Sequence, residues 1–215
     1  MWSGGETRAV IALALLLGLH SALVPVPTAA QRGERVAHRN LAELVEEAAT
    51  IFRGQVTHIE IEPHPVFENL PTIVVTLEVL EVLKGQVNGN THYSFRQFVP
   101  DLRDRDSRLG YKVGQEVLLL MIEPSQYGLS SPAGLEQGRF RVLHDAQGNA
   151  SVVNGFNNLG LFRNIGKSAP RLGQQLSATA QQMLTEHRGG PIRYDQLREM
   201  IHGIVALEHS VGPVN

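Results

Sequence analysis

Cysteine is absent from this chain of 215 residues. The protein therefore has no disulfide bond, no thiolate ligand for a structural zinc site and no residue that a lipoprotein pathway could acylate. Disulfides are typical of small exported scaffolds, whereas a chain of this length can bury a hydrophobic core without them. We expect noncovalent packing alone to hold the fold together.

An excess of charge of either sign is also missing. Lysine and arginine total 19 against 21 aspartate and glutamate residues, which leaves a formal net charge of −2. Proteins that bind nucleic acid or an anionic membrane through their general charge carry a strongly positive field. We therefore expect no nucleic-acid partner. No internal repeat with a period of about 20 to 50 residues is apparent.

A hydrophobic run long enough to cross a membrane is lacking as well. The apolar stretch at residues 9–24 follows Arg8 and is shorter than the roughly 20 apolar residues that a membrane helix needs. Prolines come next, and Thr28 and Ala30 are small residues of the kind that a signal peptidase requires. We predict that residues 1–30 are a cleaved signal peptide. The alternative is an uncleaved anchor helix.

Cleavage after Ala30 gives a mature protein that begins at Gln31, is periplasmic or secreted, and has no membrane span. Residues 31–39 are polar and irregular, so we expect a flexible N-terminus. Asn40 then has the features of a helix N-cap, because Glu43 follows three positions later. The apolar residues of this short helix recur on one face: Leu41, Leu44, Val45 and Ala48.

From residue 50 onward the pattern is that of β-strands. Residues 50–61 and 72–83 are rich in valine, isoleucine, threonine and leucine, and a proline-bearing connection separates them. This arrangement predicts two antiparallel neighbours. Gly54 indicates a bulge or a bend in the first of them. Residues 91–98 alternate polar and aromatic side chains, which predicts a third strand with one polar face.

Two further strand signals follow. Residues 116–122 form a nearly continuous apolar run, which is typical of a strand buried on both faces. Residues 138–154 predict a hairpin that turns at residues 145–148. The side chains expected in the core of this sheet are Val75, Leu77, Val79, Leu118 and Leu120.

We therefore predict a mostly β, α+β protein in which residues 40–165 form a small OB-like antiparallel barrel. After Phe162 the period of the apolar residues changes to that of helices, so residues 166–215 are expected to form a helical C-terminal appendage. The second of its two helices follows an Asp195 cap. The first apolar stripe is Leu172, Leu176, Ala180, Met183 and Leu184, and the second is Leu197, Met200, Ile201, Ile204 and Val205.

Four segments of the chain follow one another in a distinctive order. They read LAELVEEAATIFRGQVTHIE, TIVVTLEVLEVLKG, YKVGQEVLLLMI and GLEQGRFRV. This order resembles a group of exported bacterial proteins of unknown function, whose pattern combines a phrase like ADxIFxGxV, a strand ending in VLKG and a GxExLLF-type strand. It is more distantly similar to the OB-like barrel of netrin and metalloprotease-inhibitor (TIMP) modules. The resemblance covers residues 41–154 and implies that barrel fold.

The resemblance to the inhibitors implies no site residue in this chain. In the inhibitors, an N-terminal cysteine chelates the zinc ion of the target protease. Here the expected mature terminus is Gln31 and no cysteine exists. What carries over is the fold alone, and a fold does not determine a function.

Catalytic and metal-binding motifs are missing from the sequence. None of the nine histidines forms a His-Glu-x-x-His motif. His58, His64 and His92 could approach one another if the first and third strands pair, and otherwise we expect them on polar strand surfaces. His202 and His209 share a face of the last helix. Serine appears in a GLSSPAG loop without the Gly-x-Ser-x-Gly elbow of a nucleophile. We predict no metal site, no cofactor and no catalytic residue.

Two loops are candidates for recognition. One alternates three aspartates and three arginines, and it is either plain solvated surface or a patch that binds a partner through bidentate arginine contacts. The other reads LGLFRNIG, and we expect it to close one end of the barrel rather than to form an exposed docking site. The residues of the charged loop that could bind a partner are Asp101, Arg103, Asp104, Arg105, Asp106 and Arg108.

The sequence thus favours an exported, non-enzymatic binding module that acts on a protein partner in the envelope or outside the cell. The alternative is a hydrolase or metal-dependent enzyme whose site is assembled from residues distant in sequence, such as His58, His92 and Asp101. An enzyme would need a concave pocket with converging polar groups.

Overall fold

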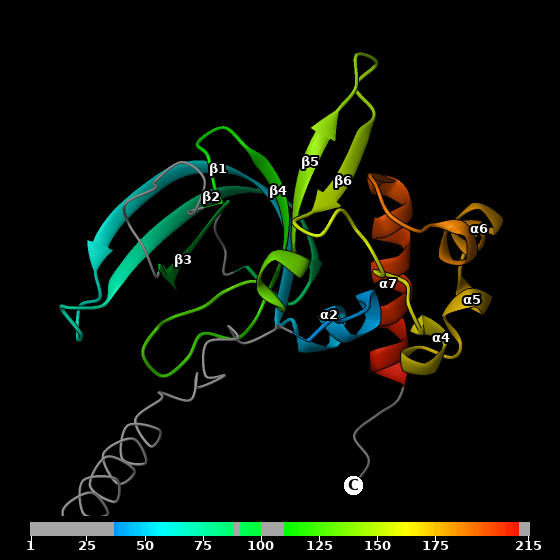
Figure 1. Ribbon diagram of the computed structural model, residues 1–215, viewed down its shortest axis with the longest axis horizontal. Coiled ribbons are helices and arrows are strands. Elements are labelled where there is room, and N and C mark those ends of the chain that lie inside the picture. The colour runs from blue at the N-terminus through cyan, green and yellow to red at the C-terminus, as the bar shows by residue number, and fades with distance from the viewer. Residues whose placement is uncertain (1–36, 88–90, 100–109, 211–215) are drawn as a thin grey trace, which may run out of the picture. The chain divides into compact units, whose positions relative to one another are not determined.

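The computed structural model describes residues 37–87, 91–99 and 110–210 (Figure 1). The predicted signal peptide and the charged loop at residues 101–108 lie outside these residues. Within the described ranges, no helix is long and apolar enough to cross a membrane.

Seven strands form one sheet in which every neighbouring pair is antiparallel. Their spatial order is β3-β2-β1-β4-β5-β6-β7, and Figure 1 shows β1 and β2 as long, curved ribbons. The predicted mostly β, α+β class is confirmed. The strands are β1 (Thr50–Pro63), β2 (Pro71–Lys84), β3 (His92–Phe98), β4 (Glu116–Met121), β5 (Arg139–His144), β6 (Ala150–Asn154) and β7 (Ile192–Arg193).

The predicted irregularity at Gly54 is confirmed. The pairing of β1 with β2 shifts register between Arg53 and Gly54. A Cβ atom at Gly54 would lie 2.7 Å from the carbonyl oxygen of Glu78 on β2. Only glycine therefore permits this close approach of the two backbones, and the shift helps to bend the long strand.

Strand β4 is buried on both faces, as its apolar sequence predicts. Val117, Leu119 and Met121 belong to one hydrophobic cluster, which also holds Phe52 of β1 and Phe95 of β3. The alternate residues of β4 point to the opposite face and pack in a second cluster with the helices; they are Leu118 and Leu120. Of the five predicted core residues in the sheet, four are buried and Val79 is partly buried.

The barrel is not confirmed, because the sheet remains open. Beyond β4 the strand order continues to β5, β6 and β7 instead of returning to β3. A short stretch at residues 129–133 partly fills the gap between β3 and β4. It makes one bridge from Leu129 to Arg96 and another from Pro132 to Met121. In addition, the N–H of Ser130 donates to the carbonyl oxygen of Arg96 at 2.9 Å.

Helices cover the face of the sheet that carries Leu118. They are α2 (Leu41–Glu47), α4 (Ile165–Ser168), α5 (Leu172–Gln175), α6 (Ala178–Glu186) and α7 (Tyr194–Ser210), and a 3₁₀ turn, η2 (Leu135–Gln137), precedes β5. Asn40 and Glu43 form the predicted capping box at the start of α2. The first predicted C-terminal helix is divided, because Leu176 is extended and Ser177 caps a new helix.

The C-terminal helices share one core with the sheet. Leu197, Met200 and Ile201 of α7 are fully buried and belong to the same cluster as Phe140 of β5 and Leu41 of α2. The expected plug, LGLFRNIG, contributes to this cluster through Leu161, Phe162 and Ile165, while Leu159 is exposed. The segment thus packs in the helix-side core, and because the sheet is open, its expected role in closing a barrel end is not confirmed.

Candidate functional site

The predicted recognition loop lies outside the described residues, but both of its flanks are fixed. On one side, the N–H of Val99 donates to the carbonyl oxygen of Pro71 at 3.1 Å. On the other side, Tyr111 is buried, and the guanidinium of Arg139 lies 4.7 Å from the centre of its ring. Burial is the main cause of the raised pKa of the Tyr111 hydroxyl. The loop therefore starts beside Pro71, where the β1–β2 connection ends.

The structure does not bring the three strand histidines together. Strand β2 lies between β1 and β3, so His58 and His92 are not on adjacent strands. The Nε2 atom of His58 instead lies 3.7 Å from the Glu60 carboxylate. His64 is buried, which corrects the expectation of a surface position. Among the described residues, no group of three or more histidine, aspartate or glutamate side chains could hold a metal ion.

A network of charged groups joins α7 to the sheet. The Tyr194 hydroxyl donates to Glu81 at 2.7 Å, and Arg198 donates to the same carboxylate at 3.2 Å. Arg53 lies over the Tyr194 ring with its guanidinium carbon 4.6 Å from the ring centre. Burial and the hydrogen bond to Glu81 raise the pKa of Tyr194. Because the charged groups here are paired, the network fastens the first turn of α7 to β1 and β2.

A hollow of about 830 Å³ lies between α7 and the helices that precede it. Its charged side chains are also paired. Arg193 donates to Asp195 at 2.7 Å and holds the pKa of that carboxyl below its usual range. Glu199 accepts a hydrogen bond from the Ser177 hydroxyl at 2.9 Å. Its two acidic side chains therefore already accept hydrogen bonds from within the chain.

A different arrangement occurs at the far end of the β1–β2 hairpin, where two turns meet. Residues 64–70 connect the strands, and the turn is closed by a 2.9 Å hydrogen bond from the N–H of His64 to the carbonyl oxygen of Leu70. A second turn follows β4 and is closed by a 2.8 Å bond from the N–H of Gly128 to the carbonyl oxygen of Ser125. Exposed apolar side chains project from both turns. We call this surface the aromatic tip, and it consists of Val66, Phe67 and Tyr127.

The buried ring of His64 holds the two turns together. Its Nδ1 atom accepts hydrogen bonds from the N–H groups of Val66 and Phe67, both at 3.1 Å. A ring nitrogen that accepts carries no proton, so Nε2 is the protonated nitrogen. It donates to the carbonyl oxygen of Tyr127 at 2.8 Å. One neutral imidazole therefore fixes both turns at once.

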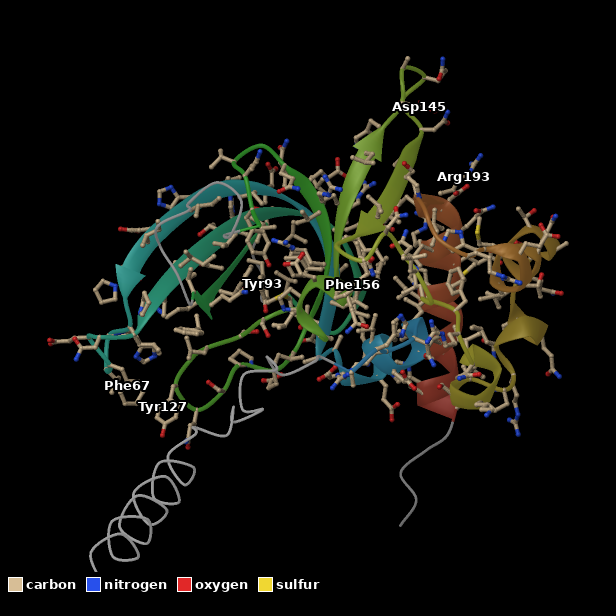
Figure 2. All side chains as sticks on the ribbon, viewed as in Figure 1. Phe67, Tyr93, Tyr127, Asp145, Phe156 and Arg193 are labelled. Atoms are coloured by element: carbon tan, nitrogen blue, oxygen red, sulfur yellow. The ribbon has the colours of Figure 1, made fainter. Side chains whose placement is uncertain are left out.

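The rings of the aromatic tip also pack against one another. Phe67 stacks on His64 with a centroid distance of 5.1 Å, and Tyr127 meets Phe67 edge to face at the same distance. Figure 2 shows Phe67 and Tyr127 side by side at the end of the hairpin. Even so, 43% of Phe67, 49% of Tyr127 and 68% of Val66 remain accessible to solvent. The backbone thus holds three large apolar side chains outside the core.

The surroundings of the aromatic tip are acidic. A hollow of about 300 Å³ lies against the same turn, and its lining includes Glu62 and Glu68. The sequence contains no lysine or arginine between Arg53 and Lys84. It also contains none from residue 113 to residue 138, the range that includes the Tyr127 turn.

One arginine from a neighbouring strand reaches this region. Arg96 of β3 pairs with Glu62 and donates to the Thr72 hydroxyl at 2.8 Å. Its charge is therefore offset by a carboxylate. Glu68 makes no ion pair with a described residue.

Comparisons with known proteins leave the chain unassigned. No family model matches it. No curated protein matches it either.

The aromatic tip was missed by reasoning from the sequence, although a signal for it exists. The connection EPHPVFENLP places valine and phenylalanine between prolines and an asparagine, where turns usually carry polar residues. Tyr127 comes from a loop about 60 residues later, so the pairing of the two turns could not be predicted. Buried His64, which joins them, had been assigned to the surface.

Proposed function

We propose that this chain is an exported binding module that acts on a protein partner in the envelope or outside the cell. The observation that carries this function is the aromatic tip, in which a buried histidine holds Phe67, Tyr127 and Val66 outside the core. Export is proposed from the apolar stretch and the small-residue cleavage site within residues 1–30.

The physical support is preorganisation. Tyrosine and phenylalanine supply large contact areas with few rotatable bonds, and aromatic residues are enriched at the energetic centres of protein interfaces. A surface that is already ordered loses less conformational entropy when it binds. In the aromatic tip, three hydrogen bonds to the His64 ring order the two turns before any partner arrives.

The finer description of the fold is also a proposal. We propose that β1 to β4 form a half-closed, OB-like barrel, because residues 129–133 bridge both β3 and β4. The kinship with the uncharacterised exported bacterial group, and the more distant one with netrin and TIMP modules, rest on the motifs within residues 41–154. In such a barrel, the aromatic tip is formed by connecting turns, which commonly carry binding residues on a rigid scaffold.

A site-specific cross-link tests this function in cells. A photoreactive phenylalanine analogue replaces Phe67 in the full-length chain, and irradiated cells are analysed by mass spectrometry. Leu80 of β2 serves as the control position because its exposure, 47%, is close to the 43% of Phe67. We expect a protein adduct from position 67 that is absent from position 80 and is lost when Tyr127→Ser is added. Equal adducts from both positions would contradict a specific binding surface.

A further inference from the structure

We propose that the aromatic tip binds an extended, positively charged segment of its partner that carries an apolar side chain next to lysine or arginine. This inference rests on the proposed binding function and specifies the chemistry of the partner. It combines two observations, the ordered apolar surface of Phe67 and Tyr127 and the carboxylates that surround it.

The apolar part of the segment has a defined place to contact. Phe67 and Tyr127 meet edge to face, and both rings remain partly exposed to an incoming side chain although Phe67 also stacks on His64. Their neighbour Val66 is the most exposed of the three. An aliphatic or aromatic side chain that covers this surface removes apolar area from water on both partners, which favours association.

The charged part of the segment is specified by the acidic hollow. Glu68 lies in the same turn as Phe67, and Glu62 lines the hollow with it. Glu60 precedes Glu62 by two residues on β1; its side chain is 60% exposed and lies 3.7 Å from Nε2 of His58. The hairpin itself carries no lysine or arginine between Arg53 and Lys84, and Arg96, which reaches it from β3, is paired with Glu62. Glu68 is therefore the carboxylate of the hollow that a cation from the partner would pair with.

The same charges argue against two other classes of partner. A nucleic acid presents phosphates, and a bacterial membrane presents anionic head groups, so both would be repelled by Glu68, which lies in the same turn as Phe67. Exposed aromatic residues alone also suit a lipid surface. The sign of the surrounding charge is what favours a basic protein segment.

Fluorescence anisotropy with a defined probe tests the inference. The probe is a fluorescein-labelled peptide in which lysine alternates with phenylalanine, and the matched control peptide has glutamate in place of lysine. The protein is the full chain in mild detergent. We expect the lysine peptide to bind, with an affinity that falls as salt is added, and the glutamate peptide to bind at least about tenfold more weakly.

Two variants separate the apolar contribution from the charged one. We expect Phe67→Ser to weaken binding of the lysine peptide about tenfold or more, as at the centre of an interface. We expect Glu68→Gln to weaken it about threefold and to flatten its salt dependence. Glu68 is exposed, so the melting curve of its variant should match that of the parent chain. Phe67 also packs on His64 and Tyr127, so folding of Phe67→Ser is verified by an unchanged circular dichroism spectrum. Leu80→Ser on β2 is the matched control and should leave affinity unchanged.

The outcomes distinguish this inference from the function on which it rests. Equal binding of both peptides, or unchanged affinity in both Phe67→Ser and Glu68→Gln, overturns the basic-segment inference. If the peptide test fails in this way but position 67 still gives a specific protein adduct, the binding function is retained and the partner has a different chemistry. A third outcome is that the protein binds vesicles of phosphatidylcholine and phosphatidylglycerol but neither peptide, and that Phe67→Ser abolishes vesicle binding. This outcome identifies a membrane as the occupant and also overturns the basic-segment inference.

Discussion

Replacing His64 with alanine tests whether one imidazole holds the aromatic tip in place. The change removes two hydrogen bonds within the turn and one to the carbonyl oxygen of Tyr127. Each is worth about 0.5 to 1.5 kcal/mol. Val66 and Phe67 lie at the surface, so water can replace part of the lost bonding in the variant, which places the total near the lower end. We expect a loss of about 2 kcal/mol in the free energy of unfolding.

His64→Asn is the matched control. An asparagine Oδ1 atom can accept from the N–H groups two and three residues ahead, as in an Asx turn. Asp145 of this protein acts similarly, since its Oδ1 accepts from Gln147 and Asn149 at 2.9 and 2.8 Å. The variant should keep the turn and lose the link to Tyr127, at a cost of about 1 kcal/mol.

Urea denaturation and amide hydrogen exchange measure the two effects separately. We expect the amides of Val66 and Phe67 to exchange faster in His64→Ala and to retain protection in His64→Asn. A loss below about half a kcal/mol in His64→Ala, with exchange of both amides unchanged, would show that the ring does not order the tip.

The remaining predictions concern the core, the loop, acid stability and processing. Leu118→Ala should cost about 2 to 5 kcal/mol in chemical denaturation, and a loss under about 0.5 kcal/mol would contradict its place in a central strand. Replacing both Arg103 and Arg105 with alanine should leave the melting temperature unchanged, since exposed pairs contribute about 0 to 1 kcal/mol each. If that loop recognises the partner, the same variant weakens binding by roughly 2 kcal/mol. Unchanged affinity would show that the loop is plain solvated surface. Burial lowers the pKa of His187, so the folded state binds fewer protons than the unfolded chain and stability falls as the pH drops below the ordinary histidine range. His187→Phe should reduce this loss between neutral and mildly acidic urea titrations, and an identical loss would exclude His187 as its source. N-terminal sequencing of exported protein should begin at Gln31 or within about three residues of it, and an intact leader would favour the anchor helix.

Local features of the fold could be predicted from the sequence because their causes are local. The capping box of Asn40 and Glu43 needs only residues three positions apart, and the structure contains it. The continuous apolar run of β4 likewise predicted a strand buried on both faces, and each face packs in a hydrophobic cluster. Strand β7, with only Ile192 and Arg193, is too short to produce a periodic signal and was not predicted.

Features that depend on long-range pairing could not be predicted. Closure of the sheet depends on what lies beside β3, and there a loop, residues 129–133, takes the place of a strand. The error over His58 and His92 has the same origin, because it assumed that β1 and β3 are neighbours. The aromatic tip joins turns that are distant in sequence, so its existence followed only from the folded arrangement.

The alternation of side chains along β4 has a consequence for how this protein comes apart. Leu118 and Leu119 are consecutive residues, yet each is fully buried in a different hydrophobic cluster. If β4 leaves its place in the sheet, apolar side chains of both clusters become exposed to water. The helices and the curved half of the sheet are therefore expected to unfold together. Although the molecule has two cores, we expect a single cooperative unfolding transition.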